Sequence, residues 1–249
     1  MGTMQWLNHF ESSVHQPRVL DWSRGIHVQE PLRTPLLRSL QTIQRGLSSP
    51  GLDFRTKVRS ACPPEYAECI DLYVREKAIH SDLLAKVLWM AGERPISRQW
   101  TDFAFRRLRR RFDWAAELMV LLTAEMASAP YFRVLYNAVN DPLLHDVLDS
   151  IMVDQSYHLG FHIDHLRGEL ERRTPAERAM LQQGWAAFFN GVLGVVIFDN
   201  GDVFDALGYD RLTFWTDARN LFAQVQSGLH GSQHMAAILG RDPRLRFVV

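Results

Sequence analysis

Two histidines occupy helical segments in which a histidine could ligate a metal. They end the runs Glu76-Lys77-Ala78-Ile79-His80 and Asp154-Gln155-Ser156-Tyr157-His158. A dimetal site in a helix bundle takes a Glu-x-x-His pair from each of two helices and one further Glu from each of two others. Here Lys77 and Gln155 stand three residues before the histidines, and none of the ten histidines has Asp or Glu at that position. The histidines fit such a site, but both bridging carboxylates are missing.

The missing carboxylates limit the chemistry of such a site. Two dications a few Å apart need bridging anions that hold and neutralise them. Lys77 would add a positive charge in a low-dielectric interior, and Gln155 would offer only a neutral oxygen. The residue types therefore predict no ordinary two-metal centre. Lys77 has a second interpretation, because an amine in an apolar core loses its proton more easily and can act as a base or a nucleophile.

Two acids lie one helical turn before the histidines. Glu76 precedes His80 by four residues, and Asp154 precedes His158 by four, so each pair shares a helix face. These acids either replace the missing metal ligands or orient the histidines through hydrogen bonds, as acids around metal-ligating histidines commonly do. The orienting role is the favoured interpretation.

Helices must position these residues, because apolar side chains recur at three- and four-residue spacing along the chain. Pro63-Pro64 and Asp141-Pro142 suit helix starts, and Thr174-Pro175-Ala176-Glu177 is a capping box. The expected helices span 35–47, 63–90, 97–111, 113 to a kink at Pro130, 141–173, 174 onward and 211–229. Residues 1–30 are expected to be irregular. No strand alternation occurs in the sequence, so the predicted class is all-α.

Composition excludes some partners. Lys and Arg together number 28, as do Asp and Glu, so no net charge favours nucleic acid or a membrane surface. The run Arg106–Arg111 is taken as a solvated helix face rather than a patch for an anionic partner. Cys62 and Cys69 are expected to be structural thiols in a reducing cytoplasm, and no signal peptide is expected. The apolar stretch 185–198 is too short for a membrane span and is expected to be a buried core helix.

Several fragments together resemble a bacterial ferritin-like family. They are Ala124-Glu125, Tyr131, Asp141-Pro142 and the run from Asp154 to His162, which in that family usually reads Asp-Glu-x-x-His-x-x-Phe-His. The segment from Glu76 to Pro95 is similar to the Glu-Glu-x-x-His helix of the same group. The likeness covers about residues 35–170. It implies a ferritin-like four-helix bundle with extra C-terminal helices, descended from carboxylate-bridged dimetal oxidases or oxygenases that act on small molecules.

The resemblance also assigns ligand positions. His80, Glu125 and His158 fall on metal ligands of the family, whereas Lys77 and Gln155 stand where its bridging glutamates belong. The first-helix glutamate falls on Leu47. The resemblance therefore leaves a rebuilt site that is either metal-free or holds one iron or manganese ion on His80, Glu125 and His158, with Lys77 competing for Glu125.

Aromatic residues and further histidines surround this predicted site. Tyr73 and Tyr157 flank it, where they either line a substrate pocket, act as redox residues or simply pack. His162 and His165 continue the face of His158 and are expected to be hydrogen-bonded core histidines rather than zinc ligands.

The sequence thus predicts one ferritin-like domain over 1–249, with an irregular segment 1–30, a bundle core 32–173 and additional helices 174–249. The leading functional interpretation is an enzyme that transforms a small molecule in the altered bundle core, of oxidoreductase type by resemblance. The alternative is a non-catalytic scaffold or partner subunit in which a Lys77–Glu125 pair replaces the metal. A small-molecule substrate is expected, nucleic acid and membrane are not, and a homodimer is left open. The expected catalytic residues are Lys77, Glu125, Gln155 and Tyr157, and the expected metal residues are His80, Glu125, His158, Glu76 and Asp154.

Overall fold

A computed structural model describes residues 2–16, 18–48, 51–97, 107 and 112–230. In these ranges every regular element is a helix and no strand occurs, which confirms the all-α prediction. The expected helix at 97–111 and the arginine run within it lie, Arg107 apart, outside the described residues. The chain divides into two compact units. Unit 1 comprises Met1–Trp114 and Val139–Val147, and unit 2 comprises Ala115–Ala138 and Leu148–Val249.

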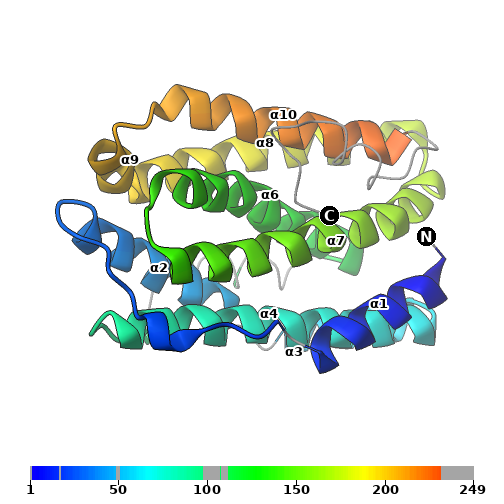
Figure 1. The fold of residues 1–249 in the computed structure, drawn as a ribbon. Helices are drawn as coiled ribbons and strands as arrows, with labels where there is room; N and C mark the ends of the chain where they lie inside the picture. Colours follow the sequence, from blue (N-terminus) through cyan, green and yellow to red (C-terminus); the bar gives the residue numbers. More distant parts are fainter. Residues whose placement is uncertain (1, 17, 49–50, 98–106, 108–111, 231–249) are drawn as a thin grey trace. The chain divides into compact units, whose positions relative to one another are not determined.

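Unit 1 is built around one long helix. Helix α4 (Pro64–Met90) carries α1 (Thr3–His15), α2 (Arg33–Leu47) and α3 (Leu52–Ala61) against it (Figure 1). Helix α4 starts at the expected proline pair and ends before Gly92, whose φ of 80° is a left-handed conformation that glycine adopts without strain. Helix α2 begins two residues before the expected start at Pro35. The boundaries of these two helices could therefore be predicted from proline, glycine and apolar spacing.

The N-terminal prediction was wrong, because α1 is a regular helix within the segment expected to be irregular. Trp6, Phe10 and Val14 are buried and recur every four residues, so they form one narrow apolar stripe. Packing of this stripe on α4 stabilises the helix, although its sequence offers no strong capping residue. The short helix α3 was likewise not predicted, and it buries Phe54 and Val58.

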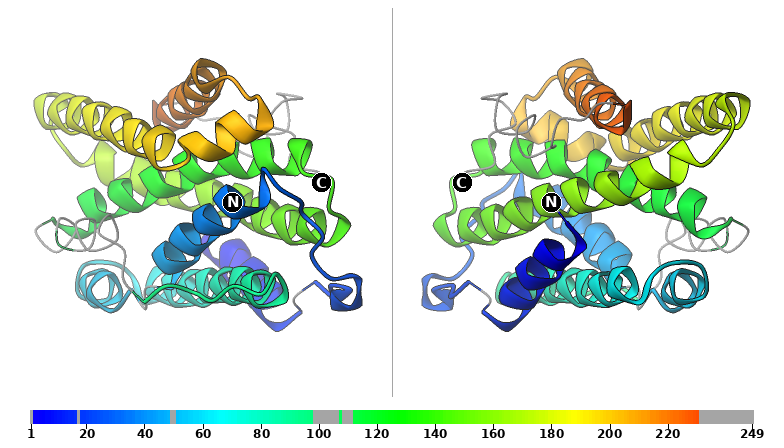
Figure 2. Two further views of the ribbon diagram at one scale, coloured as in Figure 1. Left: turned by 90° about the vertical axis from the view of Figure 1, so that its left-hand side faces the viewer. Right: turned by 90° about the vertical axis from the view of Figure 1, so that its right-hand side faces the viewer.

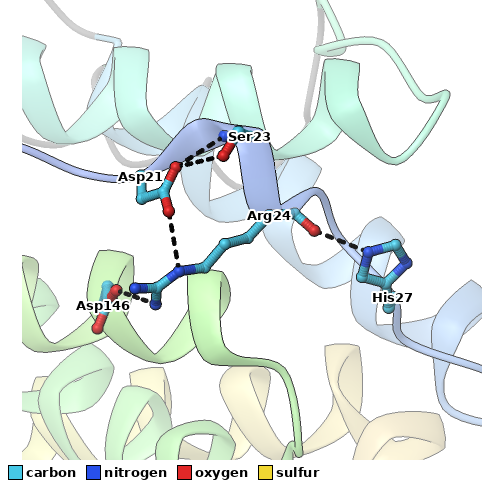
Figure 3. Close-up of polar contacts among 5 residues, drawn as sticks. All are labelled: Asp21, Ser23, Arg24, His27 and Asp146. Carbon is cyan, nitrogen blue, oxygen red and sulfur yellow. Dashed lines mark hydrogen bonds and ion pairs between the residues drawn. The ribbon is translucent and has the colours of Figure 1, made fainter.

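An extended segment between α1 and α2 is fastened to the start of α7 (Pro142–Glu171). In this segment the 3-10 turn η1 (Trp22–Arg24) presents Arg24, whose Nη1 lies 3.1 Å from Asp146 Oδ2 (Figure 3). The backbone N–H of His27 donates to Asp141 Oδ2 at 2.6 Å, while Asp141 Oδ1 accepts from the Leu144 N–H at 2.8 Å. Asp141 therefore caps α7, as the sequence predicts, and also anchors the segment.

Unit 2 contains the rest of the chain's helices. They are α6 (Trp114–Ala138), most of α7, α8 (Pro175–Asp199), α9 (Gly201–Leu207) and α10 (Arg211–His230). Helix α6 begins directly after Asp113 and continues through Pro130 to Ala138. Helices α8 and α10 lie side by side (yellow and orange in Figure 2). The capping box at α8 is formed as predicted, with Thr174 and Glu177 each bonding the other's backbone N–H.

Helix α8 departs from the prediction of a buried core helix. Only Trp185, Phe189 and Leu193 are buried in it. Trp185 and Phe189 contact Phe222 of α10, and the rings of Phe189 and Phe222 stack with their centroids 4.5 Å apart. Phe198 is 84% exposed. Hydropathy predicts that a segment is apolar, and it does not say how many faces of the helix are covered.

In the part of the chain that the structure describes, two helices are long and apolar enough to cross a membrane by length and composition alone, namely α6 and α8. Helix α6 is mostly buried within the protein, as core helices of this kind are.

The four long helices expected to form the bundle core are all present. Helices α2 and α4 pair in unit 1, and α6 and α7 are joined by side-chain hydrogen bonds in unit 2. The relative positions of the two units are not determined. The ferritin-like arrangement of the two pairs, and the single domain, therefore stay predictions.

Candidate functional site

A buried polar cluster joins α6 to α7 within unit 2. Glu125 and Ser128 are three residues apart on α6, and Gln155 and His158 are three apart on α7, so each pair projects from one helix face. Glu125, Gln155 and His158 are almost completely buried, with 2%, 1% and 0% of their surface exposed. Burying a charged or polar group is costly unless it is hydrogen-bonded. The contacts within this cluster therefore decide what it can do.

The side-chain amide of Gln155 is a hydrogen-bond donor in this cluster. Its Nε2 donates to Glu125 Oε2 at 3.0 Å and to Ser128 Oγ at 2.9 Å, which uses both of its N–H groups. The Ser128 hydroxyl donates in turn to the backbone carbonyl of Glu125 at 3.2 Å. The reverse orientation of the amide would place its oxygen against a carboxylate. The Glu125 carboxylate thus fixes the orientation of Gln155.

The side-chain oxygen of Gln155 is an acceptor to which no described residue donates a hydrogen bond. Gln155 Oε1 is buried, and among the described residues it accepts no hydrogen bond. A buried oxygen of this kind costs about 1–3 kcal/mol if it stays unsatisfied. A water molecule or a polar group of a small ligand would supply the missing donor.

His158 lies beside the same carboxylate. Its Nδ1 is 3.7 Å from Glu125 Oε1, and both groups are buried. This distance is longer than a hydrogen bond and short enough for an ion pair when the imidazole is protonated. Glu125 is therefore held between a neutral donor and a base, an arrangement suited to moving protons.

The cluster does not fit a two-metal centre. A bridging carboxylate would stand at position 155, beside Glu125. Gln155 instead directs N–H groups toward the Glu125 carboxylate, and N–H groups cannot ligate a cation. Within the described part of the chain, no three His, Cys, Asp or Glu side chains are arranged to hold a metal ion. Unit 2 offers Glu125 and His158. A one-metal set would need His80 from unit 1, and it stays a prediction.

Unit 1 carries a second buried polar cluster, on α4. Glu76, His80 and Ser81 are all buried. Glu76 accepts a hydrogen bond from the Ser13 hydroxyl of α1, and Ser81 Oγ accepts one from Gln44 Nε2 of α2 at 2.9 Å. The acid that precedes His80 by one turn is therefore bonded to the N-terminal helix, in the segment expected to be irregular.

Gln44 is a site residue that the sequence interpretation missed. The resemblance placed the first-helix ligand on Leu47, which is half-buried, whereas Gln44 is buried, as is Ser39 in the same helix. A signal for it was present, because Gln44 continues the apolar stripe of Leu36 and Leu40 at four-residue spacing. An amide on such a stripe must find a partner inside the protein.

Other predicted site residues are less deeply placed. Lys77, Asp154 and Tyr157 are half-buried, whereas Tyr73 is buried. Lys77 and His80 belong to unit 1, and Glu125 and His158 belong to unit 2. The convergence of His80 with Glu125, and the Lys77–Glu125 pair, consequently stay predictions.

Of the two histidines that follow His158 and were expected in the core, His162 is buried and His165 is half-buried. His162 is fully buried, and His165 Nδ1 is hydrogen-bonded to the Phe161 carbonyl at 2.9 Å. Burial lowers the pKa of His165, against smaller raising effects of that hydrogen bond and of Asp164. Both cysteines are free thiols, and burial raises the pKa of Cys69 to about 11. A thiol with so high a pKa is poorly reactive.

Comparisons with protein families, curated proteins and solved structures found no significant match to this chain. The family resemblance therefore rests on the sequence fragments alone.

Proposed function

We propose that this protein is a ferritin-like enzyme that transfers protons to or from a small molecule at a metal-free site formed by Glu125, Gln155 and His158. The observation that carries the proposal is the hydrogen bond from Gln155 Nε2 to Glu125 Oε2 within a buried cluster. In the inherited pattern this position would hold a second carboxylate. An amide there makes a metal unnecessary for holding Glu125 in place.

Each residue has a distinct role in this proposal. Glu125 accepts and returns the proton, because it is the buried carboxylate that the other groups surround. Gln155, which Ser128 holds in place, orients the Glu125 carboxylate, and Gln155 Oε1 accepts a hydrogen bond from the substrate. His158, 3.7 Å from Glu125, compensates the carboxylate charge when protonated. Lys77 and Tyr157 are proposed as residues that line the site.

The resemblance to dimetal oxidases supports a small-molecule substrate, and the loss of the bridging carboxylates argues against oxygen activation. The free thiols Cys62 and Cys69 are compatible with a reducing cytoplasm. The substrate is expected to be compact, neutral or weakly basic, because the site already contains a buried carboxylate that repels a second anion.

Deuterium exchange tests this proposal with a panel of compounds in place of one chosen substrate. The purified protein is incubated in D₂O with a mixture of small ketones, imines and amines, and deuterium at carbon is measured by mass spectrometry. The wild type should label at least one compound, and Glu125→Gln should lose about 100-fold or more of that rate. Glu117→Gln is the matched control, because Glu117 is another buried carboxylate of α6. Equal labelling by Glu125→Gln and wild type would refute the assignment of Glu125.

The alternative is a non-catalytic scaffold. It is favoured by the same hydrogen bonds, because both N–H groups of the Gln155 amide find acceptors, on Glu125 and Ser128, without a ligand. A scaffold predicts no labelling of any compound and a loss of stability in Glu125→Gln. Both functions predict this loss of stability, so the exchange experiment is the measurement that distinguishes them.

A further inference from the structure

Helix α8 has a second apolar face, opposite the one that it buries. Met180 is 69% exposed and Phe198 is 84% exposed. These residues are 18 apart, about five turns, so they point in the same direction. The exposed residues nearest the line that joins them are small or aliphatic, namely Gly184, Ala187, Gly191, Gly194 and Val195, and the polar Gln183 lies at the edge of this face. We call the seven residues other than Gln183 the outer stripe of α8.

From this stripe we propose that two copies of the chain form a dimer by antiparallel packing of α8 on α8. The first argument is the order of side-chain sizes, which is symmetric about position 189. An antiparallel pair centred there sets Met180 against the partner's Phe198, Gly184 against the partner's Gly194 and Ala187 against the partner's Gly191. Large side chains then meet at both ends, where sulfur and aromatic ring attract each other, and small ones meet in the middle.

The glycines permit a close approach of the two helices. A Cβ added at Gly184, Gly191 or Gly194 would meet no atom within 4 Å, so no neighbour among the described residues accounts for their small size. Glycine inside a helix is less stabilising than alanine. Small residues let two helix backbones come together, as in helix pairs with small-residue interfaces.

Charges at the two ends of α8 complement each other in the same arrangement. No charged residue occurs from Ala179 to Phe198. Arg178 lies at the N-terminal end, where Arg172 is paired with Glu169. Asp199 and Asp202 lie at the C-terminal end, where Asp205 is paired with Arg211. Glu177 at the N-terminal end is engaged in the capping box with Thr174. Antiparallel pairing brings the arginines of each copy near the aspartates of the other, whereas parallel pairing would bring like charges together.

Lipid could also cover an apolar helix face, but the packing of α8 argues against its crossing a membrane. Its opposite face is built into unit 2, where Trp185 Nε1 donates to Thr123 Oγ1 at 2.9 Å and Phe189 stacks on Phe222. A helix surrounded by lipid would lose these contacts. A second copy needs only the outer stripe, and a two-fold interface uses the same surface twice.

Sedimentation velocity of the full chain over a concentration series tests the dimer. The wild type should dimerise, and Phe198→Glu should raise the dimer dissociation constant by about tenfold or more. Leu52→Glu is the matched control, because Leu52 is 63% exposed on α3 in the other unit. Gly191→Leu should weaken the dimer while keeping or raising the melting temperature, since leucine favours the helix and obstructs only the close approach.

A charge-reversal cycle tests the antiparallel orientation. Arg178→Glu and Asp199→Arg should each weaken the dimer, and the double variant should restore it to within about threefold of the wild type, because opposite charges face each other again. A wild type that stays monomeric at about 0.1 mM would overturn the proposal. Flotation of that monomer with phosphatidylcholine–phosphatidylglycerol vesicles, abolished by Phe198→Glu, would assign the stripe to a membrane surface instead.

Discussion

Gln155 on α7 donates a hydrogen bond from its side-chain nitrogen to the Glu125 carboxylate on α6, 3.0 Å away and shielded from solvent. In a Glu-x-x-His pattern the residue at 155 would be a second carboxylate, and a cation or a shared proton would have to separate it from Glu125. The amide removes that requirement. The stability of the cluster and its response to pH and metal should therefore depend on this contact.

The variant Gln155→Glu should make the stability of the cluster depend on pH. It places two carboxyl groups about 3 Å apart, so they share a proton and the pKa of the pair rises in the folded state. A raised folded-state pKa gives stability at low pH that is lost as pH increases. Urea titrations should show the variant losing stability relative to wild type between about pH 5 and 8. A constant difference across this range would show that residues 125 and 155 do not interact.

The size of the effect of Glu125→Gln should reveal the partner of this carboxylate. If hydrogen bonds from Gln155 are its main support, the amide replacement should cost about 1–2 kcal/mol, because an oxygen acceptor remains. If Lys77 pairs with it, a buried charge loses its partner and the cost should be about 3–5 kcal/mol. Chemical denaturation of Glu125→Gln, Lys77→Met and the double variant measures this. Additive effects would contradict a Lys77–Glu125 pair.

Restoring both Glu-x-x-His pairs should restore metal uptake. The double change Lys77→Glu with Gln155→Glu supplies two carboxylates and removes the ammonium, so it should bind manganese or iron more tightly than wild type by isothermal titration. Half-buried Leu47 is expected to limit the gain to one ion. The double change Lys77→Gln with Gln155→Leu is the control. No difference between the two double variants would show that residues 77 and 155 do not share a site.

Asp141 should contribute far more to stability than the nearby Asp146. Asp141 is buried, caps α7 through the Leu144 N–H and accepts from the His27 N–H, so Asp141→Ala should cost about 2–4 kcal/mol. Asp146 pairs with Arg24 while both side chains are nearly half exposed, so Asp146→Ala should cost less than about 0.5 kcal/mol. Thermal or urea unfolding measures both. Equal costs would contradict the anchoring role of Asp141.

Burial of His165 should make stability depend on pH. Because burial lowers its pKa in the folded state, the unfolded chain binds a proton at a higher pH than the folded chain does. Its contribution to stability is therefore full above the unfolded pKa, near 6.5, and is lost as pH falls below it. His165→Gln should flatten the decline of stability between about pH 6.5 and 5. An unchanged decline in this variant would assign the pH dependence to other groups.

Helix boundaries were the most predictable part of the fold. The starts of α4, α7 and α8 follow from Pro64, from Asp141 with Pro142 and from the Thr174–Glu177 box, because proline and capping side chains act locally. Helix α1 could not be predicted with the same ease, because a stripe one residue wide is stabilised by its partner α4. The exposed face of α8 was missed for a related reason, since burial depends on neighbours that are distant in sequence.

The candidate site was predictable in residue identity more than in contact. Glu125, Gln155 and His158 were singled out by spacing and resemblance, and all three are buried in one cluster. The direction in which the Gln155 amide points, and the use of Glu76 by Ser13 of α1, depend on tertiary packing. Gln44 was overlooked because the ligand position on the first helix was assigned by resemblance, to Leu47. The four-residue spacing of the apolar stripe would have assigned it to Gln44.

Elemental analysis tests the central claim most directly. The protein is purified from cells grown with added iron and manganese, dialysed without chelator and analysed for bound metals. A site held together by the Glu125–Gln155 hydrogen bond should retain well under one equivalent of any transition metal and show no absorption of a bridged diiron centre. Two stoichiometric metal ions per chain would contradict the account and would make Glu76 and Asp154 the first ligands to examine.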